Sequence, residues 1–558
     1  MWGALFFQLF ILWVNLGFAA DSTNCEALFF QAFGQETTHA VSQTAADELG
    51  VDALLKQAEG LFETHWGKRY TEWLLSNPLQ DVQAIEDRQQ SVRELASLEL
   101  QRRLRLALNP IQRFEKRTQF WDRFFRTLKQ WAGVKNLEEL EESRSVSALT
   151  EELAKPLKLR TRISTAVFQW ILPASYLILK FGLDALAGGA PTVDQSMVLQ
   201  LLPLIGVSLQ IPAKIMHQQT RTLLTPWKLY LKSAIQLRSA LKQVKSSYLR
   251  EYYRRLDEHL QGVKETDRVF QQSLRRLHLS PLAHSIDLSR VSNLYLPILE
   301  AQARQRMESF FKLVALVSEL DALIAAGRLL NEHGFLMPKV QEFSGESLLH
   351  IEGGVHPQFQ ILGQEAVPNV SELNASGRIV YLTGGNAHGK STYLRMIGLN
   401  VLLAHAGFPV SASQMAFSPF RLFSTLGKGD ALDEGLSSFR REARRVNQIL
   451  EHLEGETPAV VLVDEVFSGT SMRERLQAER GLMEYFLQAS GVYAVVSSHN
   501  RESEFAKEER LGVSRMHASD SIETRYQILP GASRSRNARE VLREEGFPEA
   551  LLHYVEED

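Results

Sequence analysis

Residues Gly384–Ser391, "GGNAHGKS", constrain the fold most, because they match the spacing G-x-x-x-x-G-K-[ST]. The apolar run "RIVYLT" precedes them and "STYLRMIGLNVLLAHAG" follows. This order is typical of a strand that enters a helix through a tight glycine loop. Such units build a mostly parallel sheet with covering helices, so the sequence predicts an α/β domain here.

The same loop predicts a site for the phosphates of a nucleotide. Its glycines let successive N–H groups point at one phosphate, and the helix N-terminus adds its dipole. We expect Lys390 to contact the β- and γ-phosphates of ATP and the Ser391 hydroxyl to ligate Mg²⁺. The predicted nucleotide-binding residues are Gly384, Gly385, Asn386, Ala387, His388, Gly389, Lys390, Ser391 and Thr392. The alternative is a glycine-rich turn that matches by chance.

Two later apolar runs end in residues that suit the same chemistry. "VVLVDE" ends in Asp464 and Glu465, and parallel sheets place ligands at the carboxyl ends of their strands. We expect Asp464 to join Ser391 as a Mg²⁺ ligand and Glu465 to polarise the attacking water. His499 ends "VYAVVSSH", and we expect it to sense the γ-phosphate as a second catalytic residue. The alternatives are a solvated acidic turn and a structural histidine.

The 558 residues are too many for one core, and their pattern changes near residue 348. Residues 47–345 are rich in Leu, Glu, Arg and Gln with apolar positions three and four apart, which predicts a helical half. From 348 to 558, short β-branched segments alternate with helix patterns, which predicts an α/β half. The expected fold class is therefore α + α/β. The single cysteine, Cys25, excludes an internal disulfide.

The formal net charge of -3 gives the chain no global basic field, so nucleic acid would need a local patch. "RQQSVRELASLELQRRLRLAL", from Arg88, has mixed to basic polar positions at helical spacing. Such a face is usually solvated, and the alternative is a stripe that binds nucleic acid.

Three uncharged apolar stretches indicate a membrane. Residues 1–20 run into Asp21 as "GFAAD", which suggests a signal peptide or an N-terminal anchor, although a basic leading region is missing. Residues 163–179 and 195–213 approach the ~20 residues that span a bilayer, and both outer flanks are basic. We therefore expect a transmembrane hairpin over 163–213 and a membrane-associated protein whose ATPase domain is cytoplasmic. The alternative is a buried hairpin in a soluble cytoplasmic protein.

Four segments together resemble the ATPase domain of the MutS family of DNA mismatch-repair proteins. They are "TGGNAHGKSTYLR", "LSSF" at Leu436–Phe439, "VLVDEVFSGTS" ending at Ser471, and "SSHN". "GVHPQF" from Gly354 and "YQILPGASRSRNAREVLREEGFP" from Tyr526 resemble the opening and closing parts of that domain. "WLLSNPLQDVQAIEDRQQSVREL" is similar to the start of the family's helical core or lever domain. The resemblance is strong from about residue 348 and weak before it.

The resemblance implies a paired ATPase. In this family the serine-bearing loop of one subunit completes the nucleotide site of the other, so Ser437 and Ser438 would contact the partner's γ-phosphate. The implied partners are a second copy of the chain and double-stranded or branched DNA, held by helical arms under the control of ATP.

The chain also departs from the family pattern. Gly385 stands where the family has proline, His388 where it has a small residue, and Val466–Phe467–Ser468 where it prefers a glycine-arginine pair. The space before Trp73 is too short for the family's mismatch-reading domain, and no residue identified in the sequence supports specificity for mismatches.

Two other functions remain open. A membrane-tethered switch would use ATP to act on a protein partner, which the sequence does not name, without binding DNA. An ABC-type transport ATPase would also pair two such sites. It is disfavoured because "LSSFRRE" stands where an L-S-G-G-Q signature is needed and because two membrane helices are few for a transport pathway.

Overall fold

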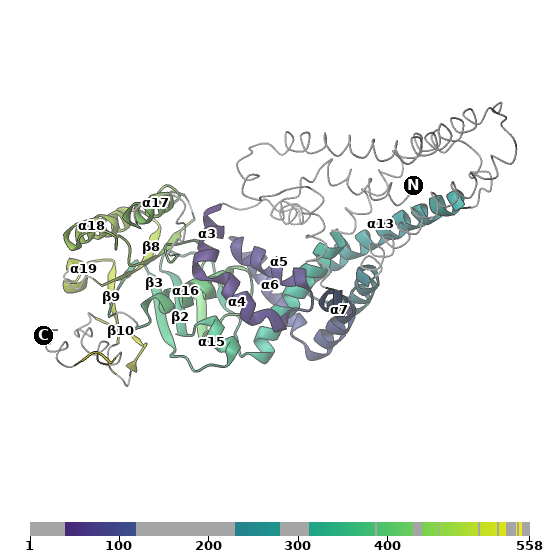
Figure 1. Cartoon of the computed structure of the whole chain (residues 1–558), viewed down its shortest axis with the longest axis horizontal. Coiled ribbons are helices and arrows are strands. Elements are labelled where there is room, and N and C mark those ends of the chain that lie inside the picture. The colour runs from purple at the N-terminus through teal and green to yellow at the C-terminus, as the bar shows by residue number, and fades with distance from the viewer. Residues whose placement is uncertain are drawn as a thin grey trace, which may run out of the picture. The chain divides into compact units, whose positions relative to one another are not determined.

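The computed structural model describes residues 40–118, 229–278, 312–385, 388–427, 438–455, 457–499, 503–519, 521, 524–531, 543 and 546–548 (Figure 1). The apolar stretches 1–20 and 163–213 lie outside these residues. Within the part of the chain that is described, no helix combines the length and the apolar character needed to cross a membrane.

The described residues form two compact units. The smaller unit contains residues 106–118, 229–242, 253–278 and 312–317, and the larger unit contains residues 40–105, 243–252 and those from 318 onward. In the smaller unit the helices pack through buried Leu108, Ile111, Leu237 and Leu256. There the Tyr230 hydroxyl donates a hydrogen bond of 2.6 Å to Glu115.

The described residues of the N-terminal part are mainly helical, as the sequence predicts. The helices among them are α3 (Ala40–Leu49), α4 (Val51–Gln57), the 3₁₀ helix η1 (Ala58–Leu61), α5 (His65–Ser76), α6 (Val82–Leu95), α7 (Leu98–Thr118), α13 (Ser247–His278) and two helices over 229–240 and 312–332. Local chemistry sets several boundaries. Gly50, with φ 84°, separates α3 from α4, and the side chains of Thr64 and Asp81 cap α5 and α6.

A buried carboxylate ties the helix over 312–332 to the start of α5. Asp321 accepts hydrogen bonds from the backbone N–H groups of Glu63 (3.1 Å) and Thr64 (2.8 Å) and from the Thr64 hydroxyl (2.8 Å). A Cβ at Gly67 would lie 2.1 Å from Asp321 Oδ2, so only glycine fits there. Burial raises the pKa of the Asp321 carboxyl to about 7, although these hydrogen bonds act in the opposite direction.

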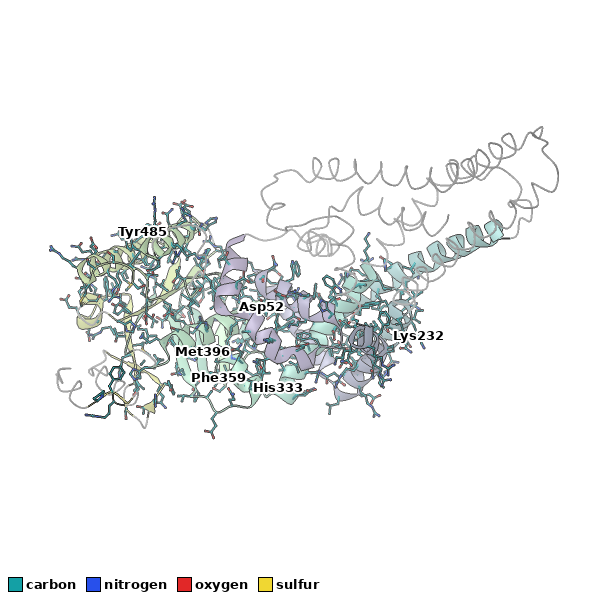
Figure 2. The ribbon with its side chains drawn as sticks, in the orientation of Figure 1. Asp52, Lys232, His333, Phe359, Met396 and Tyr485 are labelled. Atoms are coloured by element: carbon teal, nitrogen blue, oxygen red, sulfur yellow. The ribbon has the colours of Figure 1, made fainter. Side chains whose placement is uncertain are left out.

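Asp321→Asn is expected to remove part of the pH dependence of stability. The folded protein holds a proton on Asp321 between pH 4 and 7 that the unfolded chain releases, so stability falls as pH rises through this window. The full shift corresponds to at most about 4 kcal/mol. The melting temperature of Asp321→Asn minus that of the natural protein should therefore increase by several degrees as the pH rises from 4 to 7. Asp52→Asn, at the exposed Asp52 (Figure 2), is the control. A difference in melting temperature that is the same at every pH would contradict this prediction.

A six-stranded, mostly parallel sheet forms the centre of the C-terminal domain, as the sequence predicts. Its strand order is β10-β9-β4-β8-β7-β6, and only the β9–β10 pair is antiparallel. The strands are β4 (Ile379–Thr383), β6 (Arg421–Ser424), β7 (Ala459–Asp464), β8 (Val492–Ser498), β9 (Val513–Ala518) and β10 (Ile528–Pro530). β4, β7 and β8 thus lie next to one another in the interior of the sheet.

A second sheet of four strands has the order β1-β5-β2-β3. Its strands are β1 (Lys339–Val340), β2 (Ser347–Gly354), β3 (Asn369–Asn374) and β5 (Gln414–Phe417), and β2 pairs antiparallel with both neighbours. Gly354 allows a close approach here, because a Cβ would lie 2.8 Å from the sulfur of Met396 (Figure 2). This contact joins the second sheet to the helix that follows β4.

Helices cover both faces of the six-stranded sheet (Figure 1). They are α16 (Lys390–His405) on one face and α17 (Ser438–Leu450) and α18 (Met472–Gln488) on the other, with the short α15 (Pro357–Leu362) and α19 (Glu504–Lys507) nearby in the domain. Successive side chains of β7 point to opposite faces of the sheet. Leu462 points toward Gly398 of α16, whereas Val461 and Val463 join a buried cluster with Ile449 of α17. The apolar run of β7 is therefore buried on both sides.

Candidate functional site

The loop between β4 and α16 needs glycine at two positions. Gly384 has φ 147° and Gly389 has φ 87°, conformations that side chains with a Cβ disfavour. A Cβ at Gly384 would also lie 2.9 Å from the Cβ of Ala518. Gly389 is the N-cap of α16 and offers no side-chain cap, so the first turn of the helix presents backbone N–H groups to the loop. Asn386 and Ala387 lie outside the described residues.

Lys390 extends back into this loop from the first turn of α16. Its Nζ donates hydrogen bonds to the carbonyl oxygens of Gly384 (3.0 Å) and Gly385 (2.9 Å). It also lies 3.2 Å from Glu465 Oε1. The side chain is only 3% exposed, so these acceptors compensate the cost of burying its charge.

Glu465 and His499 meet at the same place from the ends of β7 and β8. His499 Nε2 lies 2.7 Å from Glu465 Oε1, while His499 Nδ1 lies 3.1 Å from the carbonyl oxygen of Gly384. Burial alone would raise the pKa of the Glu465 carboxyl, but the hydrogen bond from His499 and the charge of Lys390 lower it to about 2. The three side chains that the sequence marks separately therefore form one contact cluster in which Glu465 is ionised.

Asp464 lies beside this cluster at the end of β7. The hydroxyl of Ser497 donates a hydrogen bond of 2.6 Å to Asp464 Oδ1, and the Asp464 N–H donates to the hydroxyl of Thr425 (3.2 Å). Ser391, in the first turn of α16, is half-buried and Thr392 is exposed. Carboxylate and hydroxyl oxygens are suitable donors for Mg²⁺, so the residues present fit such an ion.

The segment after Glu465 packs against the start of α17. Glu465 and Phe467 adopt positive φ angles of 48° and 63°, which non-glycine residues rarely do. The ring of Phe467 lies 6.0 Å from that of Phe439, and Ser468 donates from its N–H (2.8 Å) and its hydroxyl (2.9 Å) to Glu442. The end of β7 and the start of α17 thus form one packed body. Ser437 lies outside the described residues, and of Ser438 only the backbone, which opens α17, is described.

Tyr526 is a residue of the site that the motif analysis does not identify. A Cβ at Gly389 would lie 3.3 Å from Tyr526 Cδ1, so the aromatic ring borders the loop. The ring is 44% exposed and the residue has φ 69°. Asn369 fixes this turn, because its side chain donates to the Tyr526 carbonyl (3.1 Å) and accepts from the Ile528 N–H (2.7 Å). An exposed aromatic ring thus flanks the glycine loop. His388, within the loop, is only 9% exposed.

Comparison with known proteins agrees with this architecture. Residues 380–557 match the family MutS domain V. The chain is 29% identical over 263 residues to the "DNA mismatch repair protein MutS" of Natronomonas pharaonis, a match that covers 46% of this chain and 30% of that protein. It is 26% identical over 312 residues to the "DNA mismatch repair protein MutS" of Aquifex pyrophilus, covering 55% of this chain and 35% of that protein.

The matched regions thus amount to about a third of the length of these curated relatives. The segment that matches MutS domain V, residues 380–557, includes the glycine loop, the ends of β7 and β8, and Tyr526. The C-terminal part of the chain, residues 380–557, is therefore similar to domain V of MutS proteins.

Proposed function

We propose that the C-terminal domain, placed at residues 348–558, binds and hydrolyses ATP with Mg²⁺. The observation that carries the proposal is the meeting of Lys390, Glu465 and His499 at the loop that begins with Gly384. A buried cation beside a glycine loop suits a phosphate group, and an ionised carboxylate next to it suits a water molecule that attacks the phosphate.

Each residue of the cluster has a proposed task. Lys390 exchanges the carbonyl oxygens that it now contacts for phosphate oxygens, which are stronger acceptors because they are charged. Glu465 orients the attacking water and takes up its proton, and His499 holds Glu465 in place through their 2.7 Å contact.

Ser391 and Asp464 would hold Mg²⁺, which when bound neutralises charge on the phosphates. Among the described residues, no cluster of three His, Cys, Asp or Glu side chains could hold a metal by itself. The ion would therefore take most of its other ligands from the nucleotide and from water, as Mg²⁺ commonly does.

Tyr526 is proposed to stack on the adenine base. Tyr526→Ala is expected to weaken ATP binding by about 10-fold, because stacking of a base on an aromatic ring is worth ~1–3 kcal/mol. The turnover number should change by less than about 3-fold, since the ring does not reach the reacting atoms. Titration of a fluorescent ATP analogue and steady-state phosphate release test both values. Tyr526→Phe, which keeps the ring, should bind ATP normally. Equal weakening in Tyr526→Phe and Tyr526→Ala would contradict stacking.

The proposal extends to the whole chain as an ATP-controlled homodimer that holds double-stranded or branched DNA. The two relatives described above are named DNA mismatch repair proteins, which supports DNA as the partner. Ser437 and Ser438 are proposed to reach the γ-phosphate in the partner subunit. The proposal is limited to contacts with the DNA backbone.

DNA binding can be tested with the full-length Glu465→Gln protein in detergent and ATP. Fluorescence anisotropy would compare perfect, mismatched and branched duplexes across a salt series. Binding that weakens steeply with salt and equally for perfect and mismatched duplexes would support a clamp on the backbone. Preference for the mismatched duplex would contradict the limit set above.

A second function is favoured by the two apolar stretches with basic flanks in residues 163–213. An ATP-bound dimer that binds none of the three DNA probes would overturn the DNA proposal and support a membrane-tethered switch that acts on a protein partner.

A further inference from the structure

A buried carboxylate on α18 is not explained by the proposed reaction. Glu479 is 4% exposed and points toward the six-stranded sheet. It accepts hydrogen bonds from the hydroxyl of Tyr381 and from the hydroxyl of Ser498 (2.9 Å). Another side of α18 is turned to solvent, as the exposed Tyr485 shows (Figure 2). Glu479 therefore belongs to the face of α18 that covers the sheet.

The two hydroxyls come from the strands that carry the candidate site. Tyr381 lies in β4, three positions before Gly384, and Ser498 is the last residue of β8, directly before His499. β4 and β8 pair in parallel, with Tyr381 opposite Val496 and Thr383 opposite Ser498. Side chains of paired residues point to the same face, so both hydroxyls face α18. Glu479 thus joins the ends of two neighbouring strands at the point where each passes into the site.

Neighbouring residues on β8 are divided between the two faces of the sheet. The hydroxyl of Ser497 donates to Asp464, the hydroxyl of Ser498 donates to Glu479, and His499 contacts Glu465. Three successive residues at the end of this strand therefore each hold one carboxylate. Two of these carboxylates belong to the proposed reaction, and Glu479 is the third.

Because the surroundings of Glu479 are apolar, losing its hydrogen bonds with Tyr381 and Ser498 would cost free energy. Its neighbours on α18, Leu482, Met483 and Phe486, belong to the same apolar cluster as Tyr381. A polar group buried in such a place costs free energy unless it is hydrogen-bonded, so the carboxylate and the two hydroxyls hold one another in a defined geometry. Burial, followed by the nearby negative charge of Glu479, raises the pKa of the Tyr381 hydroxyl, so Tyr381 remains a donor.

We propose that Glu479 is a positioning residue for ATP hydrolysis: it fixes the end of β8 against β4, so that His499 stays in contact with Glu465 and with the Gly384 carbonyl. The inference rests on the proposed function of the same site. Glu479 does not touch the reacting groups, and its effect reaches them through Ser498 and the adjacent His499. Loss of Glu479 should therefore impair the chemical step more than the binding of ATP.

The test is a double-mutant cycle between Glu479→Ala and His499→Ala in the full-length protein, read by phosphate release and by affinity for a fluorescent ATP analogue. Glu479→Ala is expected to lower the turnover number by about 30-fold, because a misplacement of about 1 Å can cost up to ~100-fold. Affinity for the analogue should change by less than about 3-fold. When His499 is already replaced by alanine, adding Glu479→Ala should lower the turnover number by less than about 3-fold, because the residue through which Glu479 acts is already absent.

Two further variants make the test decisive. Ser498→Ala deletes one hydroxyl, and it should lower the turnover number by about 10-fold and add little to Glu479→Ala. If Glu479→Ala fails to fold, the double-mutant cycle between Ser498→Ala and His499→Ala tests the proposal instead. Glu484→Gln is the matched control, since Glu484 lies on the same helix and its half-buried side chain pairs with Arg510 (2.5 Å) rather than with β4 or β8. Its turnover should be that of the natural protein.

The inference is overturned if Glu479→Ala or Ser498→Ala folds and loses no activity. It is also overturned if the fold-loss is equal with and without His499, because Glu479 would then act independently of the site. A natural protein that releases no phosphate from ATP would instead refute the proposed function itself. The two failures are therefore distinguishable.

Discussion

Replacement of Lys390 by alanine is expected to weaken ATP binding by at least about 100-fold, because two hydrogen bonds between a charged donor and phosphate oxygens contribute ~3–6 kcal/mol. Lys390 is buried, and its Nζ already lies within 3.2 Å of two carbonyl oxygens and Glu465. Titration of a fluorescent ATP analogue into the full-length protein measures the loss.

Lys339→Ala is the matched control for this experiment, because Lys339 is an exposed lysine on the short strand β1. It should bind the analogue with the affinity of the natural protein. Retention of tight binding by Lys390→Ala would show that the glycine loop does not hold a nucleotide, and it would refute the proposed function.

Glu465→Gln is expected to bind ATP normally and to hydrolyse it about 1000-fold more slowly. A general base contributes ~10²–10⁴-fold, and the neutral amide cannot take a proton from water. The pKa of Glu465 is lowered to about 2, so the natural side chain is ionised across the physiological range. The contribution of the ionised side chain to catalysis should be lost only as the pH falls toward 2. The pH profile of kcat/KM, which reports groups of the free enzyme, should therefore show no decline from Glu465 between pH 6 and 8.

Single-turnover phosphate release and light scattering test this variant. If subunits pair through bound ATP, the slow variant should accumulate as a dimer when ATP is present. A monomer under saturating ATP would contradict the paired arrangement. Hydrolysis at the natural rate would assign the reaction to another group.

The sequence predicts the local parts of the site because each follows from a short segment. The strands β4, β7 and β8 are apolar runs buried on both faces, and each is followed directly by a residue that marks the site: Gly384, Glu465 or His499. The helix after Gly389 begins at Lys390, where the motif places it. A parallel sheet brings the carboxyl ends of these strands to one edge, so the proximity of Glu465 and His499 could be expected before any distance was known.

Other features depend on contacts between distant segments. Tyr526 borders Gly389 from a turn that Asn369, 157 positions earlier, helps to hold. The partners of Glu479 lie on two strands and become neighbours only through the packing of α18. The second sheet also has weak local signals, because β1 has two residues and the register between β2 and β3 shifts twice.

One departure from the family pattern has a visible structural consequence. Phe467 lies in the segment where the MutS family prefers a glycine-arginine pair. It adopts φ 63°, and its ring packs on that of Phe439. A non-glycine residue in this conformation costs on the order of 1–2 kcal/mol, which the packing of its ring offsets. The sequence shows the departure, but only the fold shows how it is accommodated.

The most direct test of the central claim is the steady release of phosphate from ATP and Mg²⁺ by the purified full-length protein, measured beside Lys390→Ala, Glu465→Gln and Glu484→Gln. The account predicts release by the natural protein and by Glu484→Gln. It also predicts loss in the two site variants, through weaker binding in Lys390→Ala and through a slower chemical step in Glu465→Gln. Release that is equal in all four proteins would contradict it, because the cluster of Lys390, Glu465 and His499 would then not be the site of hydrolysis.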